Sequence, residues 1–160
     1  MTKSLFKKIF AVPLWIVAYI PLLLLWGEYG HIPYPHYDWI RYAAAFVLFW
    51  GGAALFGWCW RLLKTEGNGS PMPEEPPQTL VRSGPYRYSR NPMSVAVWMI
   101  LFGEALYFNS LYLYGWGAAA VVMMTFYIVR FEEPQLLERF GQRYMEYRAD
   151  VSRFFSIKLG

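Results

Sequence analysis

Long apolar segments alternate with short charged ones along this chain of 160 residues. A helix needs about 20 mostly apolar residues to cross the core of a bilayer. Three segments without charged residues approach that length, at residues 9–26, 42–60 and 111–129. A fourth apolar segment, residues 93–108, is shorter and contains Glu104. The pattern predicts an all-α integral membrane protein with about four transmembrane helices, or five if one span is split.

Lysine and arginine fall on one side of this predicted topology. If four spans alternate from a cytoplasmic N-terminus, both termini are cytoplasmic and only Arg41 among the basic residues lies outside. The preference of Lys and Arg for cytoplasmic loops produces such a division, which one span more or fewer would spoil. The basic residues assigned to the cytoplasm are Lys3, Lys7, Lys8, Arg61, Lys64, Arg82, Arg87, Arg90, Arg130, Arg139, Arg143, Arg148, Arg153 and Lys158.

The third predicted span is the shortest. At about 1.5 Å per residue it would reach roughly 24 Å, less than a bilayer core of about 30 Å. Either its helix begins before Met93, or it forms a thin, tightly packed hairpin with the fourth span. Glu104 is either an ionisable functional group inside the membrane or a residue at the outer interface. Small residues suited to close helix packing are Gly103, Gly115, Gly117 and Ala118 to Ala120.

A different pattern follows Val129. Apolar residues recur at steps of three and four residues with charged residues between them, which predicts a cytoplasmic amphipathic C-terminal helix. This helix is either a plain interfacial anchor or packs against the preceding loop, which is rich in proline and glycine at residues 67–78. The apolar positions are Leu137, Phe140, Tyr144, Tyr147 and Val151. We expect a single membrane-embedded domain over residues 1–160, with two N-terminal spans in 9–63.

Composition excludes several classes of function. With 56% hydrophobic and 16% charged residues, the chain is too apolar for a typical soluble domain. The formal charge of +4 arises from blocks between apolar segments, which indicates a lipid bilayer as partner and no nucleic acid. Cys59 is the only cysteine, and His31 and His36 are the only histidines, so we expect no metal site.

Two polar clusters stand where predicted spans meet the cytoplasm. Residues 82–94 read RSGPYRYSRNPMS, and residues 130–134 read RFEEP. Adjacent carboxylates at the end of a span are costly to desolvate and need polar partners, while Pro134 suits the start of a new helix. The predicted hairpin brings both clusters to the same cytoplasmic face. Backbone donors, cations, carboxylates and aromatic rings together suit a zwitterionic nucleoside such as S-adenosylmethionine.

At these residues the sequence resembles the integral-membrane methyltransferases of the isoprenylcysteine carboxyl methyltransferase and phospholipid methyltransferase families. The resemblance covers residues 80–155, through SGPYRYSRNPM and, after the hairpin, RFEEPQLLERFGQRYMEYRADVSRF. It implies a methyltransferase core in that region, S-adenosyl-L-methionine as cofactor, and a bacterial-type inner membrane as location. It also implies cofactor binding by Gly84, Tyr86, Arg90, Asn91, Pro92, Glu132 and Glu133, with Arg130 and Glu133 as the catalytic residues near the reaction centre.

The chain departs from the family pattern at two positions. Ser94 stands where a tyrosine is usual, and Asn91 replaces the histidine of the enzymes that methylate prenylcysteine. Since an amide cannot act as a base near neutral pH, the sequence favours methyl transfer to a lipophilic acceptor without naming a carboxylate, amine or thiol. Two alternatives stay open, an NADPH-dependent sterol or steroid reductase-like enzyme and a non-catalytic membrane scaffold.

Overall fold

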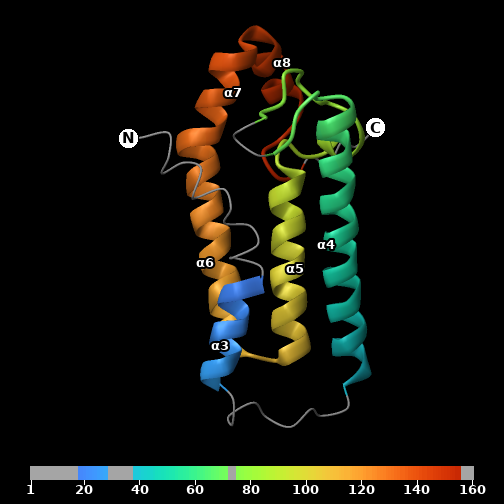
Figure 1. Ribbon diagram of the computed structural model, residues 1–160, viewed down its shortest axis with the longest axis vertical. Helices are drawn as coiled ribbons and strands as arrows, with labels where there is room; N and C mark the ends of the chain where they lie inside the picture. Colours follow the sequence, from blue (N-terminus) through green and yellow to red (C-terminus); the bar gives the residue numbers. More distant parts are fainter. Residues whose placement is uncertain (1–17, 29–37, 72–74, 156–160) are drawn as a thin grey trace. The chain divides into compact units, whose positions relative to one another are not determined.

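The computed structural model describes residues 18–28, 38–71 and 75–155, and every regular element in these ranges is helical. The all-α prediction is therefore confirmed for this part of the chain. The elements in chain order (Figure 1) are α3 (Ile20–Glu28), α4 (Trp39–Thr65), the 3-10 helix η2 (Gly84–Arg87), α5 (Pro92–Phe108), α6 (Leu111–Tyr127), the π-helix η3 (Ile128–Glu132), α7 (Glu133–Phe140) and α8 (Gln142–Asp150).

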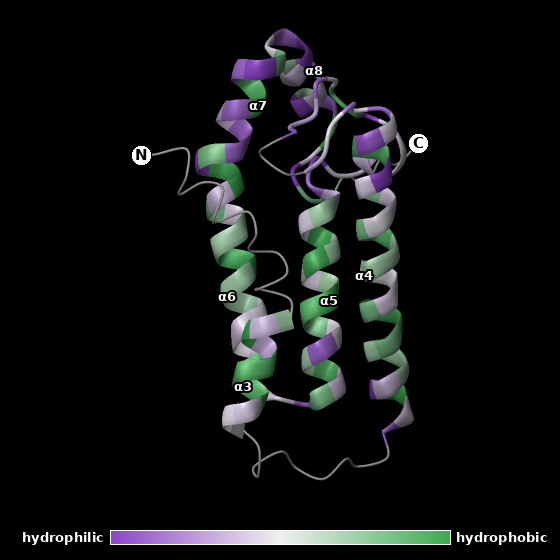
Figure 2. Cartoon of the chain, viewed as in Figure 1, coloured by the Kyte–Doolittle hydropathy of each residue, from purple (hydrophilic) through white to green (hydrophobic). Residues whose placement is uncertain are grey.

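Two of the described helices are long and apolar enough to cross a membrane. They are Trp39–Thr65 and Leu111–Phe140, and the second runs through α6, η3 and α7 without a break. Helix α5 is also apolar but shorter. Figure 2 shows hydrophobic residues along α4, α5 and α6 and hydrophilic ones in α7 and α8. The second and fourth predicted spans correspond to α4 and α6. Half of the first, residues 9–17, lies outside the described residues, so the count of four spans stays a prediction.

Helices α5 and α6 form the predicted hairpin, which turns at Asn109 and Ser110. Asn109 has a φ of 51°, in the left-handed region that asparagine tolerates better than most residues. Ser110 caps α6, because its Oγ accepts a hydrogen bond from the Leu113 N–H at 3.2 Å. At the other end, α5 begins at Pro92, where a missing N–H costs nothing. The third predicted span is therefore extended by only one residue before Met93, and its helix stays short.

The chain divides into two compact units, a first unit of residues 1–54 and 96–122 and a second unit of 55–95 and 123–160. Glycines in the first unit let α4 and α5 approach closely. A Cβ at Gly103 would lie 2.8 Å from the backbone nitrogen of Phe49, and one at Gly52 would lie 2.7 Å from the carbonyl oxygen of Ala96. Gly103 thus has the packing role expected of it, although its partner is α4.

The other predicted packing glycines differ from one another. A Cβ at Gly117 would meet the ring of Phe102 at 3.3 Å, so this position also packs closely, whereas no atom of the described residues lies within 4 Å of one at Gly115. The close packing expected at Gly115 is therefore not found in the part of the chain that the structure describes. The reason is geometric, since positions two residues apart on a helix face different neighbours.

The predicted amphipathic helix is two helices. Gly141 separates α7 from α8 with φ 53° and ψ −129°, a conformation that residues with a Cβ rarely adopt. Pro134 stands in the first turn of α7, as expected, although no break separates α7 from the helix before it. The wide turn of η3 precedes it, with the Glu133 N–H bonded to the Ile128 carbonyl. Such a turn accommodates a proline, which has no N–H to donate to the helix.

Helices α7 and α8 pack against the preceding loop, which favours the second of the two expectations for this region. Tyr144, Tyr147 and Val151 are buried against Leu80, Leu136 and Phe140. Leu137 was expected on this apolar face, but its side chain is 39% exposed and its neighbour Leu136 packs there instead. The second unit has a further core around Cys59, Leu63, Val81 and Tyr86.

We predict that Gly103→Ala destabilises the protein and that Gly115→Ala does not. The added methyl at 103 forces α4 and α5 apart, at a cost of about 1–3 kcal/mol. The same change at 115 meets nothing within 4 Å and removes the flexibility of a helical glycine, which gains about 0.5–1 kcal/mol. Unfolding of both variants by SDS titration in mixed micelles measures the difference. Equal midpoints would contradict this account of the packing.

Candidate functional site

The Gly-Pro turn at Gly84 and Pro85 is shaped by packing. Gly84 has a φ of 54°, and a Cβ there would lie 2.9 Å from Cδ1 of Leu62 and 3.2 Å from the Trp58 ring. Pro85 stands in the first turn of η2, where its fixed φ suits a helical start. The turn directs Tyr86 into the core, where it is 9% exposed. The need for glycine at position 84 is therefore explained by backbone conformation and packing alone, without any ligand.

The segment after this turn is tied to the end of the chain by its backbone. The N–H groups of Arg90 and Asn91 donate to the carbonyls of Ser152 and Arg153 at 3.1 and 3.2 Å. The Asn91 side-chain amide also donates to the Arg153 carbonyl at 3.1 Å, and Ser89 Oγ donates to the same oxygen at 3.2 Å. Asn91 is buried, and its amide orders the chain at this point.

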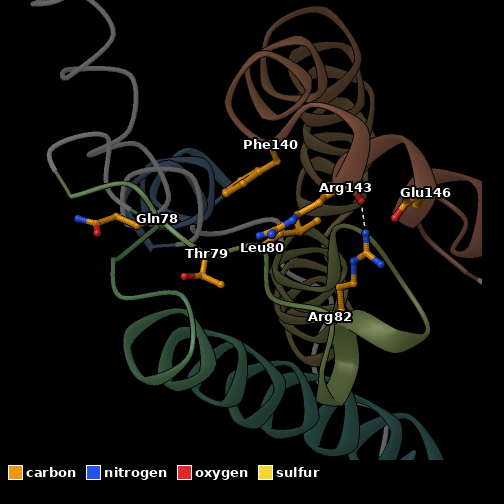
Figure 3. Close-up of a pocket in the computed structure, with 7 residues that line it drawn as sticks. All are labelled: Gln78, Thr79, Leu80, Arg82, Phe140, Arg143 and Glu146. Atoms are coloured by element: carbon orange, nitrogen blue, oxygen red, sulfur yellow. Dashed lines mark hydrogen bonds between the residues drawn. The ribbon is translucent and has the colours of Figure 1, made fainter.

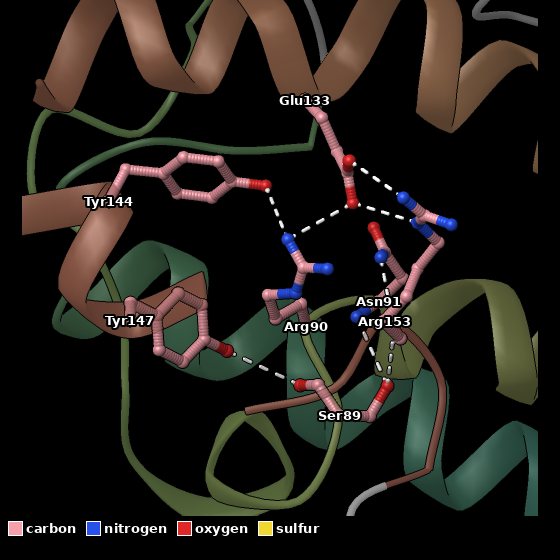
Figure 4. Close-up of polar contacts among 7 residues, drawn as sticks. All are labelled: Ser89, Arg90, Asn91, Glu133, Tyr144, Tyr147 and Arg153. Carbon is pink, nitrogen blue, oxygen red and sulfur yellow. Dashed lines mark hydrogen bonds and ion pairs between the residues drawn. The ribbon is translucent and has the colours of Figure 1, made fainter. Parts of the chain in front are cut away.

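A buried ion cluster centres on Glu133, as Figure 4 shows. Glu133 Oε1 lies 3.1 Å from Nη1 of Arg90, and these two side chains are each 7% exposed. Arg153 binds the same carboxylate in a bidentate manner, with Nε at 2.9 Å from Oε1 and Nη2 at 3.0 Å from Oε2. This fork geometry gives the strong, charge-assisted form of the interaction, and it raises the pKa of Arg153.

Two tyrosines from α8 complete this polar centre, which we define as Arg90, Glu133, Tyr144, Tyr147 and Arg153. Arg90 Nη1 donates to the Tyr144 hydroxyl at 3.3 Å. The Tyr147 hydroxyl lies 2.6 Å from the Tyr86 carbonyl and 3.3 Å from the Ser89 carbonyl, to which it donates. Burial raises the pKa of both Tyr144 and Tyr147. Both phenols are therefore neutral near pH 7.

Two groups beside the polar centre lack protein partners among the described residues. Nε of Arg90 is buried without a hydrogen-bond acceptor, and Glu132 has no hydrogen bond or ion pair to another described side chain. Burial, with smaller contributions from Cys59, Glu132 and Tyr147, raises the pKa of Tyr86. A buried donor without an acceptor requires a polar partner, which a ligand can supply.

A polar cavity of about 330 Å³ lies beside the polar centre in the same unit (Figure 3). Arg82 and Arg143 line it from the loop and from α8. The Arg82 guanidinium donates to the Arg143 carbonyl and lies over the Tyr147 ring, 5.4 Å from its centroid. Arg82 therefore contacts both the cavity and the polar centre, a role beyond the cytoplasmic positive charge that the sequence assigns to it.

The structure gathers some of the predicted site residues and leaves others apart. Arg90 and Glu133 join in the polar centre, Tyr86 and Asn91 support it through their backbones, and Pro92 is buried at the start of α5. Arg130 is exposed and makes no ion pair with a described residue, so its catalytic assignment stays a prediction.

Tyr144, Tyr147, Ser89 and Arg153 were not predicted as site residues. The periodic pattern identified the two tyrosines only as apolar positions, and Arg153 counted only as a cytoplasmic charge. A signal was available for the tyrosines, because buried Tyr hydroxyls require hydrogen-bond partners. No local signal could have found Arg153, whose partner Glu133 lies on another element.

Comparison with known families decides the class of protein. The family model described as phospholipid methyltransferase matches residues 40–143. The chain belongs to this family.

The match covers the hairpin and both polar clusters, and the protein is accordingly a methyltransferase of the membrane phospholipid type. Tyr144, Tyr147 and Arg153 follow the matched region in sequence. No curated protein and no solved structure matches the chain. The resemblance drawn from the two motifs is thus confirmed at the level of the family.

We predict that Glu133→Leu destabilises the protein by about 3–5 kcal/mol, because it leaves the buried charge of Arg90 without its partner. The double variant Arg90→Met/Glu133→Leu should be less destabilised than the sum of the single changes, since it removes both charges. SDS titration in mixed micelles measures the cycle. Glu138→Leu is the matched control, because Glu138 is exposed on α7. Strict additivity would show that the pair does not interact.

Tyr147→Phe tests the hydroxyl that joins α8 to the loop. The variant leaves the ring in place and removes the donor to two carbonyls, which costs about 1–2 kcal/mol in the same titration. Tyr88→Phe provides the control, because Tyr88 is 62% exposed. If both changes have the same small effect, the hydrogen bond from Tyr147 does not hold α8.

Proposed function

We propose that the protein transfers a methyl group from S-adenosylmethionine to a lipophilic acceptor in the membrane. The observation that carries the proposal is the buried Arg90–Glu133–Arg153 cluster, in which Nε of Arg90 has no hydrogen-bond acceptor. Membership of a methyltransferase family supports this function over the reductase and the scaffold. No feature of the described residues favours either alternative.

The groups present fit the chemistry of this cofactor. When bound, S-adenosylmethionine supplies a methyl group on a positively charged sulfur. The buried Nε–H of Arg90 is suited to a carboxylate, and the carboxylate of Glu132 is suited to an ammonium or to ribose hydroxyls. These residues would hold a zwitterionic nucleoside at the cytoplasmic ends of the spans.

The two adjacent glutamates have different roles in this proposal. Glu133 already accepts from two guanidinium groups, which makes it a weak proton acceptor and a positioning residue for Arg90. Glu132 makes no such contacts, so it is the stronger candidate for binding the cofactor or for accepting a proton from the acceptor. Arg130, exposed in the middle of η3, would serve the acceptor rather than the polar centre.

The acceptor is expected to reach the site from the bilayer, and the cofactor from the cytosol. Alignment in a dry, organised site would supply most of the rate acceleration, since methyl transfer by in-line displacement needs no covalent enzyme intermediate. The polar centre supplies that organisation, because its side chains already hold one another in place before any ligand binds.

Binding of S-adenosylhomocysteine tests the cofactor proposal. We predict that Glu132→Gln weakens its affinity about tenfold in calorimetry on purified protein, since a charge-assisted hydrogen bond is worth about 1.5–3 kcal/mol. The variant should fold normally, because Glu132 has no structural partner to lose. Glu138→Gln removes the same charge from the surface of α7 and should bind as the unaltered protein does.

Two outcomes would overturn the proposal. One is an affinity that is unchanged by both Glu132→Gln and Arg90→Lys. The other is thermal stabilisation by NADPH in place of S-adenosylhomocysteine, which would indicate a reductase. Membranes incubated with a radiolabelled methyl donor, followed by extraction of the labelled lipid, would then identify the acceptor.

A further inference from the structure

Arg153 is bound to the rest of the second unit by both its side chain and its backbone. Its guanidinium forms a fork with Glu133, with Nε 2.9 Å from Oε1 and Nη2 3.0 Å from Oε2. Its carbonyl accepts hydrogen bonds from Ser89 Oγ at 3.2 Å and from the backbone and side-chain N–H groups of Asn91 at 3.2 and 3.1 Å. Arg153 thus joins the start of α7 to the segment that leads into α5.

The net charge of the polar centre depends on Arg153. Figure 4 shows the Glu133 carboxylate between the guanidinium groups of Arg90 and Arg153. Arg90 and Glu133 alone would form a neutral pair, which attracts a further anion only weakly. With Arg153 the three side chains carry one excess positive charge. Glu132 and Arg148 also act electrostatically on Glu133, with opposite charges.

Arg153 also occupies the acceptor groups of Glu133. Oε1 accepts from Arg90 and Arg153, and Oε2 accepts from Arg153. Without Arg153, Oε2 would have no donor among the described residues, and the carboxylate would be free to turn toward the ammonium group of a zwitterionic ligand. The fork therefore keeps Glu133 as a partner of Arg90 and withholds it from the ligand.

Arg90 is held in turn, and one of its donors stays free. Its Nη1 lies 3.1 Å from Glu133 Oε1 and 3.3 Å from the Tyr144 hydroxyl, and the side chain is 7% exposed. Its Nε is buried without an acceptor. A cation that is fixed by its other nitrogen and surrounded by little water is well suited to bind an anionic group.

We propose that Arg153 is a positioning residue that makes this site select the carboxylate end of the methyl donor, because it occupies Glu133 and leaves Arg90 to bind the anion. The inference rests on the proposed function and extends it to a residue that acts through Glu133 without touching the ligand. Lysine is not an equivalent of Arg153, because its ammonium group lacks the planar fork that spans both carboxylate oxygens.

Two ligands and one substitution separate this role from a purely structural one. S-adenosylhomocysteine carries the carboxylate, whereas its decarboxylated analogue keeps only the ammonium group. Calorimetry on the purified full chain should show that the unaltered protein binds the first about tenfold more tightly. In Arg153→Gln, S-adenosylhomocysteine should bind about tenfold more weakly while the analogue keeps its affinity, so the discrimination disappears. A purely structural role would weaken both ligands by the same factor.

The substitution should leave the backbone in place, because Ser89 and Asn91 bind the carbonyl of Arg153 and not its side chain. Arg61→Gln is the matched control, since Arg61 is an exposed arginine of the same unit, and it should bind both ligands as the unaltered protein does. Arg153→Lys keeps the charge and loses the fork, so it should retain a discrimination of about threefold.

The inference is overturned if Arg153→Gln weakens both ligands equally or leaves both affinities unchanged. In either case the unaltered protein still binds S-adenosylhomocysteine and the proposed function stands. If the unaltered protein does not bind S-adenosylhomocysteine, the proposed function fails and this inference fails with it, so the two failures are distinguishable. Should Arg153→Gln fail to fold, Arg153→Lys decides the question, because equal weakening of both ligands in that variant would also contradict the inference.

Discussion

The carboxylate of Glu133 is the constraint on which the second unit depends. A buried charge is tolerated only where partners compensate for its lost hydration, and here Arg90 and Arg153 approach it from segments far apart in sequence. The same segments are joined by backbone bonds from Arg90 to Ser152 and from Asn91 to Arg153. Residues 152 and 153 are therefore fixed beside the start of α5, and neither segment can move without leaving a charge or a backbone group unpaired.

Two irregular turns make this arrangement possible. The π-helix η3 carries the chain to Glu133 without ending the helix, although Pro134 follows at once. Gly141 then reverses the chain so that α8 returns its tyrosines to the polar centre. A continuous amphipathic helix would carry Tyr144 and Tyr147 further along the same axis. Local departures from regular geometry thus supply the long-range pairing of charges.

The sequence was most informative where one element determines its own structure. Hydrophobic length predicted α4 and the α5–α6 hairpin, and the two motifs predicted that Arg90 and Glu133 belong to one site. The break at Gly141 was missed because apolar residues keep their spacing across it. Arg153 and the tyrosine hydroxyls were missed because their partners lie on other elements, so periodicity could not indicate them. Gly52 was missed because its packing partner, the carbonyl of Ala96, is invisible to a pattern of side chains.

The charges of the polar centre explain why two glutamates stand side by side. Arg90 and Arg153 carry two positive charges against the single negative charge of Glu133, so this cluster alone has an excess of one positive charge. Consecutive residues of a helix point about 100° apart, which prevents Glu132 from sharing the partners of Glu133. Glu132 makes no hydrogen bond or ion pair with another described side chain. A carboxylate that holds two guanidinium groups, as Glu133 does, is not free to receive a cationic ligand.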